Sequence, residues 1–164
     1  MIAPQTYAEE LNEVFPNAKL TAISKYGCCA FVLLWCLGIE PDHDIDAIKT
    51  VARLMDKGAI TDTCTVKWAE TIKALSGRSL KKIEFVDTKI ISNIKERTPV
   101  RYDWNGKCHW VGVENGKIAF NPLRYSYCVE KGAPASKRVI TLAKEEENGQ
   151  NRCKIIEQRG YDRI

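Results

Sequence analysis

The chain has 164 residues, of which 45% are hydrophobic and 28% charged, a balance typical of a single soluble globular domain over residues 1–164. Its 25 Lys and Arg against 21 Asp and Glu leave a net charge of +4, too small and too scattered to predict a nucleic-acid partner. The longest apolar run, residues 28–37, is far shorter than the roughly 20 residues of a membrane-spanning helix, so no membrane partner is expected.

The chain contains seven cysteines, an odd number, and its first residues lack the basic and apolar regions of a secretion signal. Free thiols in a reducing, cytoplasmic compartment are therefore expected. Zinc sites favour Cys pairs separated by roughly two to four residues, whereas the only close pair here, Cys28 and Cys29, is adjacent. We therefore expect no metal and no cofactor.

The first half of the chain shows helical patterns. Thr6 followed by Glu9 fits a capping box, which predicts a helix over residues 6–15 that Pro16 stops. A second helix is expected to begin near Cys28; it is apolar all round, as in a helix buried at the centre of a domain, and Gly38 ends it. Two further helices are expected, over residues 44–57 and from residue 63 or 65 to 76.

The periodicity then changes to the alternation of strands. The expected strands cover residues 82–86, 99–104, 108–114, 117–121, 139–143 and 154–157, with a short helix over 90–96. Asn-Gly pairs at 105–106 and 115–116 are strong hairpin signals, so the second to fourth strands should form an antiparallel meander. Helices followed by a sheet predict an α+β domain in which N-terminal helices pack on an antiparallel sheet.

The candidate nucleophile is Cys28, because it lies where an apolar helix should start. The unpaired N–H groups of a helix N-terminus favour a thiolate and lower the pKa of a thiol, which is about 8.5 in a free cysteine. Cys29 would point about 100° away around the helix axis and is more typical of a packed side chain. Small buried cysteines are common, so burial without chemistry is the competing interpretation for both residues.

The candidate base is His109, expected in the middle of a strand, since the other histidine, His43, lies in an acidic loop. Asn121 on the next strand can orient the ring, provided that both side chains lie on one face. A two-residue hairpin loop puts Asn121 on the opposite face, whereas a three-residue loop over 114–116 places it opposite His109. The hypothesis of a Cys-His-Asn triad therefore assumes the three-residue loop.

These residues resemble the papain-fold cysteine peptidases, and in particular the bacterial C39-like, bacteriocin-processing type. The order Cys, His, Asn is that of papain-like enzymes. The similarity extends over residues 20–125. Its motifs are Gly27-Cys28 before an apolar helix, the helix over 68–77, the Pro-Val strand at 98–100, the His-Trp-Val strand over 108–113, and Asn121-Pro122.

The resemblance implies a papain-like fold and an oxyanion hole completed by a Gln several residues before the nucleophile. No Gln stands in residues 21–25, so the hole would use the backbone N–H of Cys28 with Ser24 or Lys25. Cys29 also replaces the Gly that usually follows the nucleophile. The loss of one hole donor lowers rates by about 10²–10³, so the missing Gln weakens the prediction of activity more than that of the fold.

The leading hypothesis is a thiol hydrolase, a peptidase or amidase that cleaves an amide bond in a peptide or isopeptide substrate through an acyl-enzyme. Cys28, His109 and Asn121 are its expected catalytic residues. The expected setting is a cytoplasmic bacterial or phage protein. Two alternatives remain open at this point: a weakened or inactive papain-fold module that binds peptides, and an acyltransferase that shares the acyl-enzyme.

Overall fold

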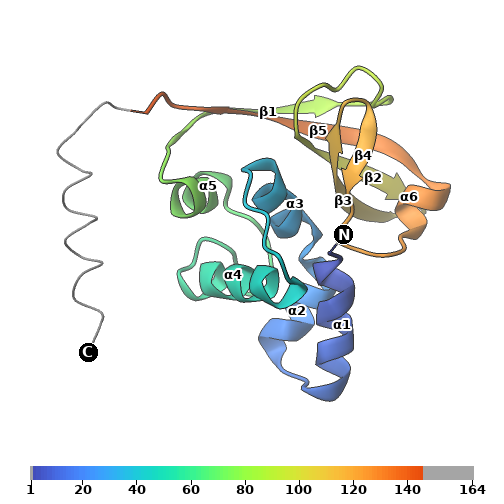
Figure 1. Cartoon of the computed structure of the whole chain (residues 1–164). Coiled ribbons are helices and arrows are strands. Elements are labelled where there is room, and N and C mark those ends of the chain that lie inside the picture. Colours follow the sequence, from blue (N-terminus) through green and yellow to red (C-terminus); the bar gives the residue numbers. More distant parts are fainter. Residues whose placement is uncertain (1, 146–164) are drawn as a thin grey trace.

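The computed structural model describes residues 2–145, so the strand expected over residues 154–157 lies outside the described residues. Helices come first along the chain and the sheet second (Figure 1). The helices are α1 (Pro4–Val14), α2 (Ala18–Tyr26), α3 (Cys28–Cys36), α4 (Asp44–Asp56), α5 (Trp68–Ser76) and α6 (Tyr127–Lys131). The strands are β1 (Leu80–Asp87), β2 (Thr98–Trp104), β3 (Lys107–Glu114), β4 (Lys117–Phe120) and β5 (Ala133–Leu142). The predicted α+β class is confirmed.

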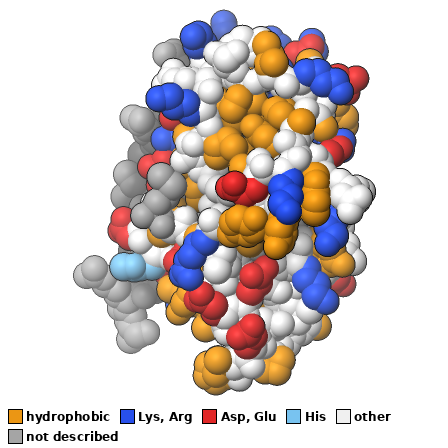
Figure 2. Space-filling model, turned by 90° about the vertical axis from the view of Figure 1, so that its right-hand side faces the viewer, with side chains coloured by type: hydrophobic (Ala, Val, Ile, Leu, Met, Phe, Trp, Pro, Cys, Tyr) orange, Lys and Arg blue, Asp and Glu red, His pale blue; other side chains and the backbone are white. Residues whose placement is uncertain are grey.

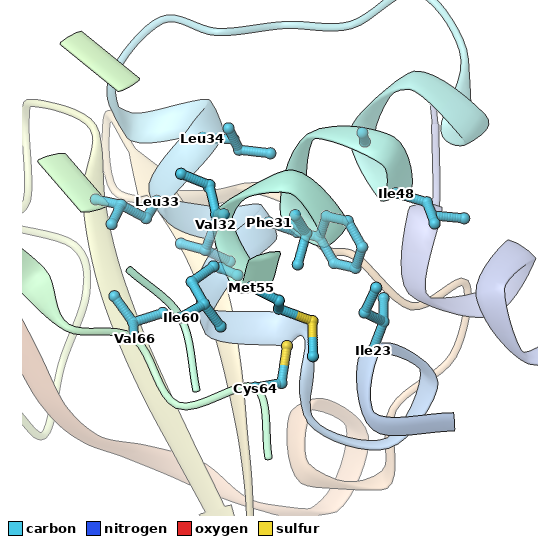
Figure 3. Close-up of a cluster of buried hydrophobic side chains, with 14 of the residues drawn as sticks. Ile23, Phe31, Val32, Leu33, Leu34, Ile48, Met55, Ile60, Cys64 and Val66 are labelled. Atoms are coloured by element: carbon cyan, nitrogen blue, oxygen red, sulfur yellow. The ribbon is translucent and has the colours of Figure 1, made fainter. Parts of the chain in front are cut away.

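The helix α3 forms the centre of the molecule, between the other helices and the sheet (Figure 1). Seven of its nine residues are buried, as its uniformly apolar sequence predicts. Figure 3 shows Phe31, Val32 and Leu33 of α3 in one cluster with Ile48 and Met55 of α4. Each fully buried side chain of this size contributes about 1.5–3 kcal/mol, so this cluster holds α3 rigidly in place.

The sheet has five antiparallel strands in the order β1-β5-β2-β3-β4. The predicted meander of β2, β3 and β4 is confirmed, and β5 inserts between β1 and β2. Because side chains alternate along β3, Trp110 and Gly112 face α3 and α5, whereas His109 and Val111 face the other way. The opposite face carries a second, smaller apolar cluster that includes Val111 and Cys128.

The helix α3 approaches β3 closely at Gly112. A Cβ atom on Gly112 would lie 2.4 Å from the ring of Trp35, so only glycine admits this contact. Trp35 also stacks on Phe120 of β4, with ring centroids 6.0 Å apart. Together these contacts fix α3 against the β3–β4 hairpin.

The expected starts of two helices are wrong, and one helix was not expected. α1 begins at Pro4, and Thr6 does not cap it but accepts a hydrogen bond from the backbone of Arg124. α2 was not predicted, although Asn17 caps it by accepting from Leu20 N at 2.9 Å. α5 begins at Trp68, because threonine hydroxyls hold the preceding segment in a turn.

The short helix expected over residues 90–96 is also wrong. This segment forms turns, with one local hydrogen bond from Ile94 N to Ile91 O, and its last carbonyl groups accept from the β3–β4 turn. Gly116 N donates to Ile94 O at 2.7 Å, and Asn115 N donates to Lys95 O at 3.0 Å. A long-range contact therefore replaces the local helix.

The surface carries both signs of charge. Figure 2 shows hydrophobic side chains gathered in two areas of one face, with Lys, Arg, Asp and Glu side chains between them. Within residues 2–145, no single helix is long and apolar enough to cross a membrane. α2 and α3 have that length and apolarity only when taken together, and a bend of 70° separates them.

Candidate active site

Cys28 is the first residue of α3, at the sharp bend between α2 and α3. Gly27 makes this bend, and a Cβ atom there would lie 2.5 Å from Ile23 O and 2.9 Å from the ring of Phe31. Glycine is therefore required before the cysteine for steric reasons. The bend places Cys28 against the backbone of Trp110 on β3, while Cys29 is half-buried.

The Cys28 thiol is buried, and this reverses the sequence-based expectation about its pKa. Burial raises the pKa of Cys28 from 9.0 to about 11, while backbone N–H groups of Trp110, Cys29 and Cys28 itself act in the opposite direction. The helix N-terminus therefore favours the thiolate, as predicted, but desolvation outweighs it. At neutral pH the unliganded site holds a neutral thiol.

His109 lies near the start of β3 and is 4% exposed. Its Nε2 lies 2.8 Å from Oδ1 of Asn121, so the predicted contact between these two residues is present. Burial lowers the pKa of His109, and the hydrogen bond to Asn121 opposes this shift. The ring is therefore neutral at pH 7.

A second hydrogen bond decides which nitrogen of His109 carries the proton. Oδ1 of Asn121 also accepts from the backbone N–H of Leu123 at 3.1 Å, and this donor identifies the Asn121 atom as the oxygen. His109 Nε2 must then be the donor in the pair. The neutral ring is protonated on Nε2 and keeps its lone pair on Nδ1, the nitrogen that can accept a proton.

The hairpin reaches this arrangement by a route that differs from the prediction. The loop has two residues, because Glu114 pairs with Lys117 and Val113 with Ile118. The next pair is Gly112 with Phe120, so Ala119 is an extra residue that forms a β-bulge. With a two-residue loop and no bulge, Asn121 would lie on the face opposite His109. Because side chains alternate between the two faces of a strand, the one extra residue moves Asn121 to the same face as His109.

Trp110 links the two parts of the site. Its backbone N–H lies against the Cys28 sulfur, at a position on β3 that β4 no longer covers, and His109 is the preceding residue. Within residues 2–145 no hydrogen bond joins the Cys28 thiol to the His109 ring. The structure thus brings Cys28, His109 and Asn121 to the same end of β3 and leaves the thiol and the imidazole unbonded.

The residues expected in the oxyanion hole have other contacts. The Ser24 hydroxyl donates to Thr21 O at 2.9 Å, so its proton is used within α2. Lys25 is exposed in the last turn of α2. Neither side chain has a hydrogen bond to the Cys28 thiol in the described part of the chain.

Gln5 is a candidate that the sequence analysis missed. It is 3% exposed in α1, its backbone N–H donates to Pro122 O, and its Nε2 donates to Ser24 O at 2.9 Å. Gln5 therefore lies between the residue after Asn121 and the helix end that precedes Cys28. Its Oε1 is buried without a partner within residues 2–145. Gln5 stands far upstream of Cys28 in the sequence, outside residues 21–25, where the resemblance implies the oxyanion-hole Gln.

No cluster of three His, Cys, Asp or Glu side chains that could hold a metal ion is found within residues 2–145. The side chains gathered around Cys28 and His109 offer nucleophile, base and amide chemistry instead. Comparison of the chain with protein-family profiles, with curated proteins and with solved structures gave no match.

Proposed function

We propose that this protein is a cysteine-nucleophile hydrolase that cleaves an amide bond in a peptide or isopeptide through an acyl-enzyme. The observation that carries the proposal is the bond between His109 Nε2 and Asn121 Oδ1, which leaves the lone pair of Nδ1 free on the strand whose next residue, Trp110, contacts the Cys28 thiol with its backbone N–H. The order of elements also supports a papain-like fold, with the cysteine on a buried central helix and the base on an antiparallel sheet.

In the proposed reaction, Nδ1 of His109 takes the Cys28 proton and the sulfur attacks the amide carbonyl. The imidazolium then protonates the leaving amine, and water hydrolyses the acyl-enzyme with the same base. Asn121 holds the ring and accepts from Nε2–H throughout. The orientation of the ring is thus fixed before the substrate binds.

The oxyanion hole in this proposal uses backbone N–H groups at the start of α3 and the side-chain amide of Gln5. The first N–H groups of a helix have no partner within the helix and stabilise a developing negative charge. Gln5 Nε2 carries a second hydrogen besides the one that it gives to Ser24 O. Gln5 replaces Ser24 and Lys25 in this role.

A peptidyl acyloxymethyl ketone tests the proposal, because its peptide part fills the site and its ketone traps a nearby thiolate. We expect peptide mass spectrometry to find Cys28 modified well before Cys108, which is exposed and therefore the more accessible thiol. The His109→Ala variant should lose this selectivity and keep the slow labelling of Cys108. Equal labelling of Cys28, Cys64 and Cys108 in the wild-type protein would rule the hydrolase out.

The second candidate is a binding module with the same fold, and the raised pKa of Cys28 favours it. A thiol with a pKa of about 11 and no hydrogen bond to His109 is a weak nucleophile until something drives the proton transfer. A module of this kind would bind peptides equally well in the Cys28→Ala variant and leave Cys28 unlabelled by the ketone. In a hydrolase, by contrast, the ketone would label Cys28 and the wild-type protein would turn over substrate.

A further inference from the structure

Arg138 lies in the middle of β5, with its guanidinium held between two aromatic rings. Its Cζ is 4.0 Å from the ring centroid of Phe85 and 4.8 Å from that of Trp110. Trp110 in turn meets Trp68 of α5 edge-on, with ring centroids 6.2 Å apart. Stacking of this kind fixes the plane of a guanidinium and leaves the donors at its edge free to bind.

The charge of Arg138 has no carboxylate partner within residues 2–145. Nη1 donates to Ser136 Oγ and Lys137 O, whereas Nε is buried and bonds to nothing described. Burial lowers the pKa of Arg138, and the positive charge of Arg101 adds to this effect. A partly buried cation without a counterion is unfavourable, and an anion placed there would relieve the cost.

Arg97 is an example of an arginine whose charge is paired within the protein. It forms ion pairs with Glu40 and Glu114 and donates to Trp35 O at 2.9 Å. Arg101 is likewise paired with Asp103, at 2.9 Å. Arg138 differs from both, because its Nε has no partner and no acidic side chain is bonded to it in the described part of the chain.

Arg138 is also close to the candidate nucleophile. The same residue, Trp110, touches Arg138 with its ring and the Cys28 sulfur with its backbone N–H. Cys29, next to the nucleophile, is near enough for the charge of Arg138 to act on its thiol. Since Trp110 and His109 face opposite sides of the sheet, the guanidinium and the imidazole lie on opposite faces of it.

From these contacts we infer that Arg138 forms a subsite for a carboxylate of the substrate, and that Trp110 connects this subsite to the reacting thiol. The inference rests on the proposed hydrolase function. The free edge of the guanidinium, formed by Nε and Nη2, fits a carboxylate in the two-bond geometry typical of arginine. The carboxylate belongs to an acidic side chain of the substrate or to its C-terminus. A neutral substrate would leave Nε unpaired.

The first experiment observes Arg138 directly and does not need catalysis. In full-length Cys28→Ala protein, the ¹⁵N–¹H resonance of Arg138 Nε is followed with three small ligands. N-acetylglutamate amide carries only the side-chain carboxylate, N-acetylglutamine carries only the α-carboxylate, and N-acetylglutamine amide carries neither. We expect a saturable shift with one or both carboxylates and none with the neutral ligand. A resonance that moves with neither carboxylate contradicts the subsite.

The carboxylate ligand that binds with the higher affinity shows which carboxylate of the substrate the subsite takes. Stronger binding of N-acetylglutamate amide points to an acidic side chain in the substrate, and stronger binding of N-acetylglutamine points to a C-terminal carboxylate. Equal affinities support a carboxylate subsite that accepts either.

The second experiment measures the rate at which Cys28 is labelled by two peptidyl acyloxymethyl ketones that differ only in Glu against Gln next to the reactive residue. We expect about a tenfold preference for the Glu probe in the wild-type protein, the effect of one charge-assisted hydrogen-bonded pair. Arg138→Gln should abolish the preference. Arg53→Gln, which removes the same charge from an exposed position on α4, should retain it.

The outcomes separate the two proposals. Labelling of Cys28 at equal rates by both probes, or a Glu preference that persists in Arg138→Gln, overturns the carboxylate subsite and leaves the hydrolase standing; Arg138 is then a structural clamp between Phe85 and Trp110. Absence of Cys28 labelling together with a saturable shift of the Arg138 resonance overturns the hydrolase and supports the carboxylate site.

Discussion

The two halves of the candidate site differ in how completely they are assembled. His109 and Asn121 are joined by a hydrogen bond, and a backbone N–H of Leu123 fixes the amide, so the base and its tautomer are set. Cys28 is positioned as firmly by α3, yet its thiol is neutral and unbonded to the ring. In the proposed mechanism, His109 is therefore ready to accept a proton, whereas Cys28 becomes reactive only after a change in its surroundings.

The physical reason for the difference is solvation. Burial favours the neutral form of the His109 ring, which is the form that can accept a proton, although the hydrogen bond to Asn121 acts against this shift. At Cys28, burial and the amide N–H groups act against each other, and burial dominates. A substrate that brings its own polar groups to the thiol would shift that balance.

The largest effect is expected from removal of the nucleophile. Cys28→Ala should lower hydrolysis of a pooled fluorogenic peptide library by about 10⁴-fold or more, because the acyl-enzyme can no longer form. Cys29→Ala, one residue away, should keep most of the activity. Comparable losses in both variants would show that the α3 N-terminus is important for stability alone.

Removal of the base should have the next largest effect. His109→Ala should reduce turnover by about 10²–10⁴-fold, the usual contribution of a positioned general base. The matched control is His43→Ala, on the loop before α4, which should be unaffected. The measurement is initial rate at pH 7 on the same peptide pool, and an unchanged rate in His109→Ala would separate His109 from the reaction.

Gln5 tests whether a distant residue completes the site. Gln5→Met should lower turnover by about 10²–10³-fold, as for other lost oxyanion-hole donors. It should also cost about 1–3 kcal/mol of unfolding free energy, because Ser24 O loses a buried donor.

Thr71→Val is the control for the Gln5 prediction. Thr71 donates to Ala59 O at 2.8 Å in a buried bond, so its loss should destabilise the protein by a similar amount without affecting turnover. Urea midpoints and rates are measured on both variants. Parallel loss of stability and activity in both would assign Gln5 a purely structural role.

The bulge provides a smaller and more specific effect. Deletion of Ala119 should turn Asn121 to the opposite face of the hairpin and lower turnover by about 10²-fold, because His109 then loses the hydrogen bond that orients its ring. Asn121→Ala should give a similar loss. The double variant should be no worse than either single variant, because both remove one interaction.

The smallest effect concerns pH. The pKa of His109 is lowered in the folded state, so its contribution to stability is present above the unfolded pKa of about 6.5 and is lost as pH falls through the folded value. Wild-type protein should therefore lose stability more steeply than His109→Gln as pH falls from 7 toward 5. The measurement is the urea midpoint against pH, and parallel curves would contradict the burial effect on His109.

The sequence by itself determined the local features of this protein. The uniformly apolar run after Cys28 predicts a buried central helix, the two Asn-Gly pairs predict the meander, and Gly27 marks the bend before the cysteine. These follow from periodicity and turn chemistry, which depend on neighbouring residues only. The choice of Cys28, His109 and Asn121 came from the same local patterns.

Only the tertiary structure decided the remaining features, since each depends on contacts between distant segments. The bulge at Ala119 follows from how β4 packs on β3 and α3, and it sets the face on which Asn121 lies. Burial by surrounding elements raises the pKa of Cys28, and no local pattern reports it. Gln5 contacts Ser24 and Pro122, and Arg138 contacts Phe85 and Trp110. These contacts form because folding brings together segments that are far apart in the sequence and excludes water from between them.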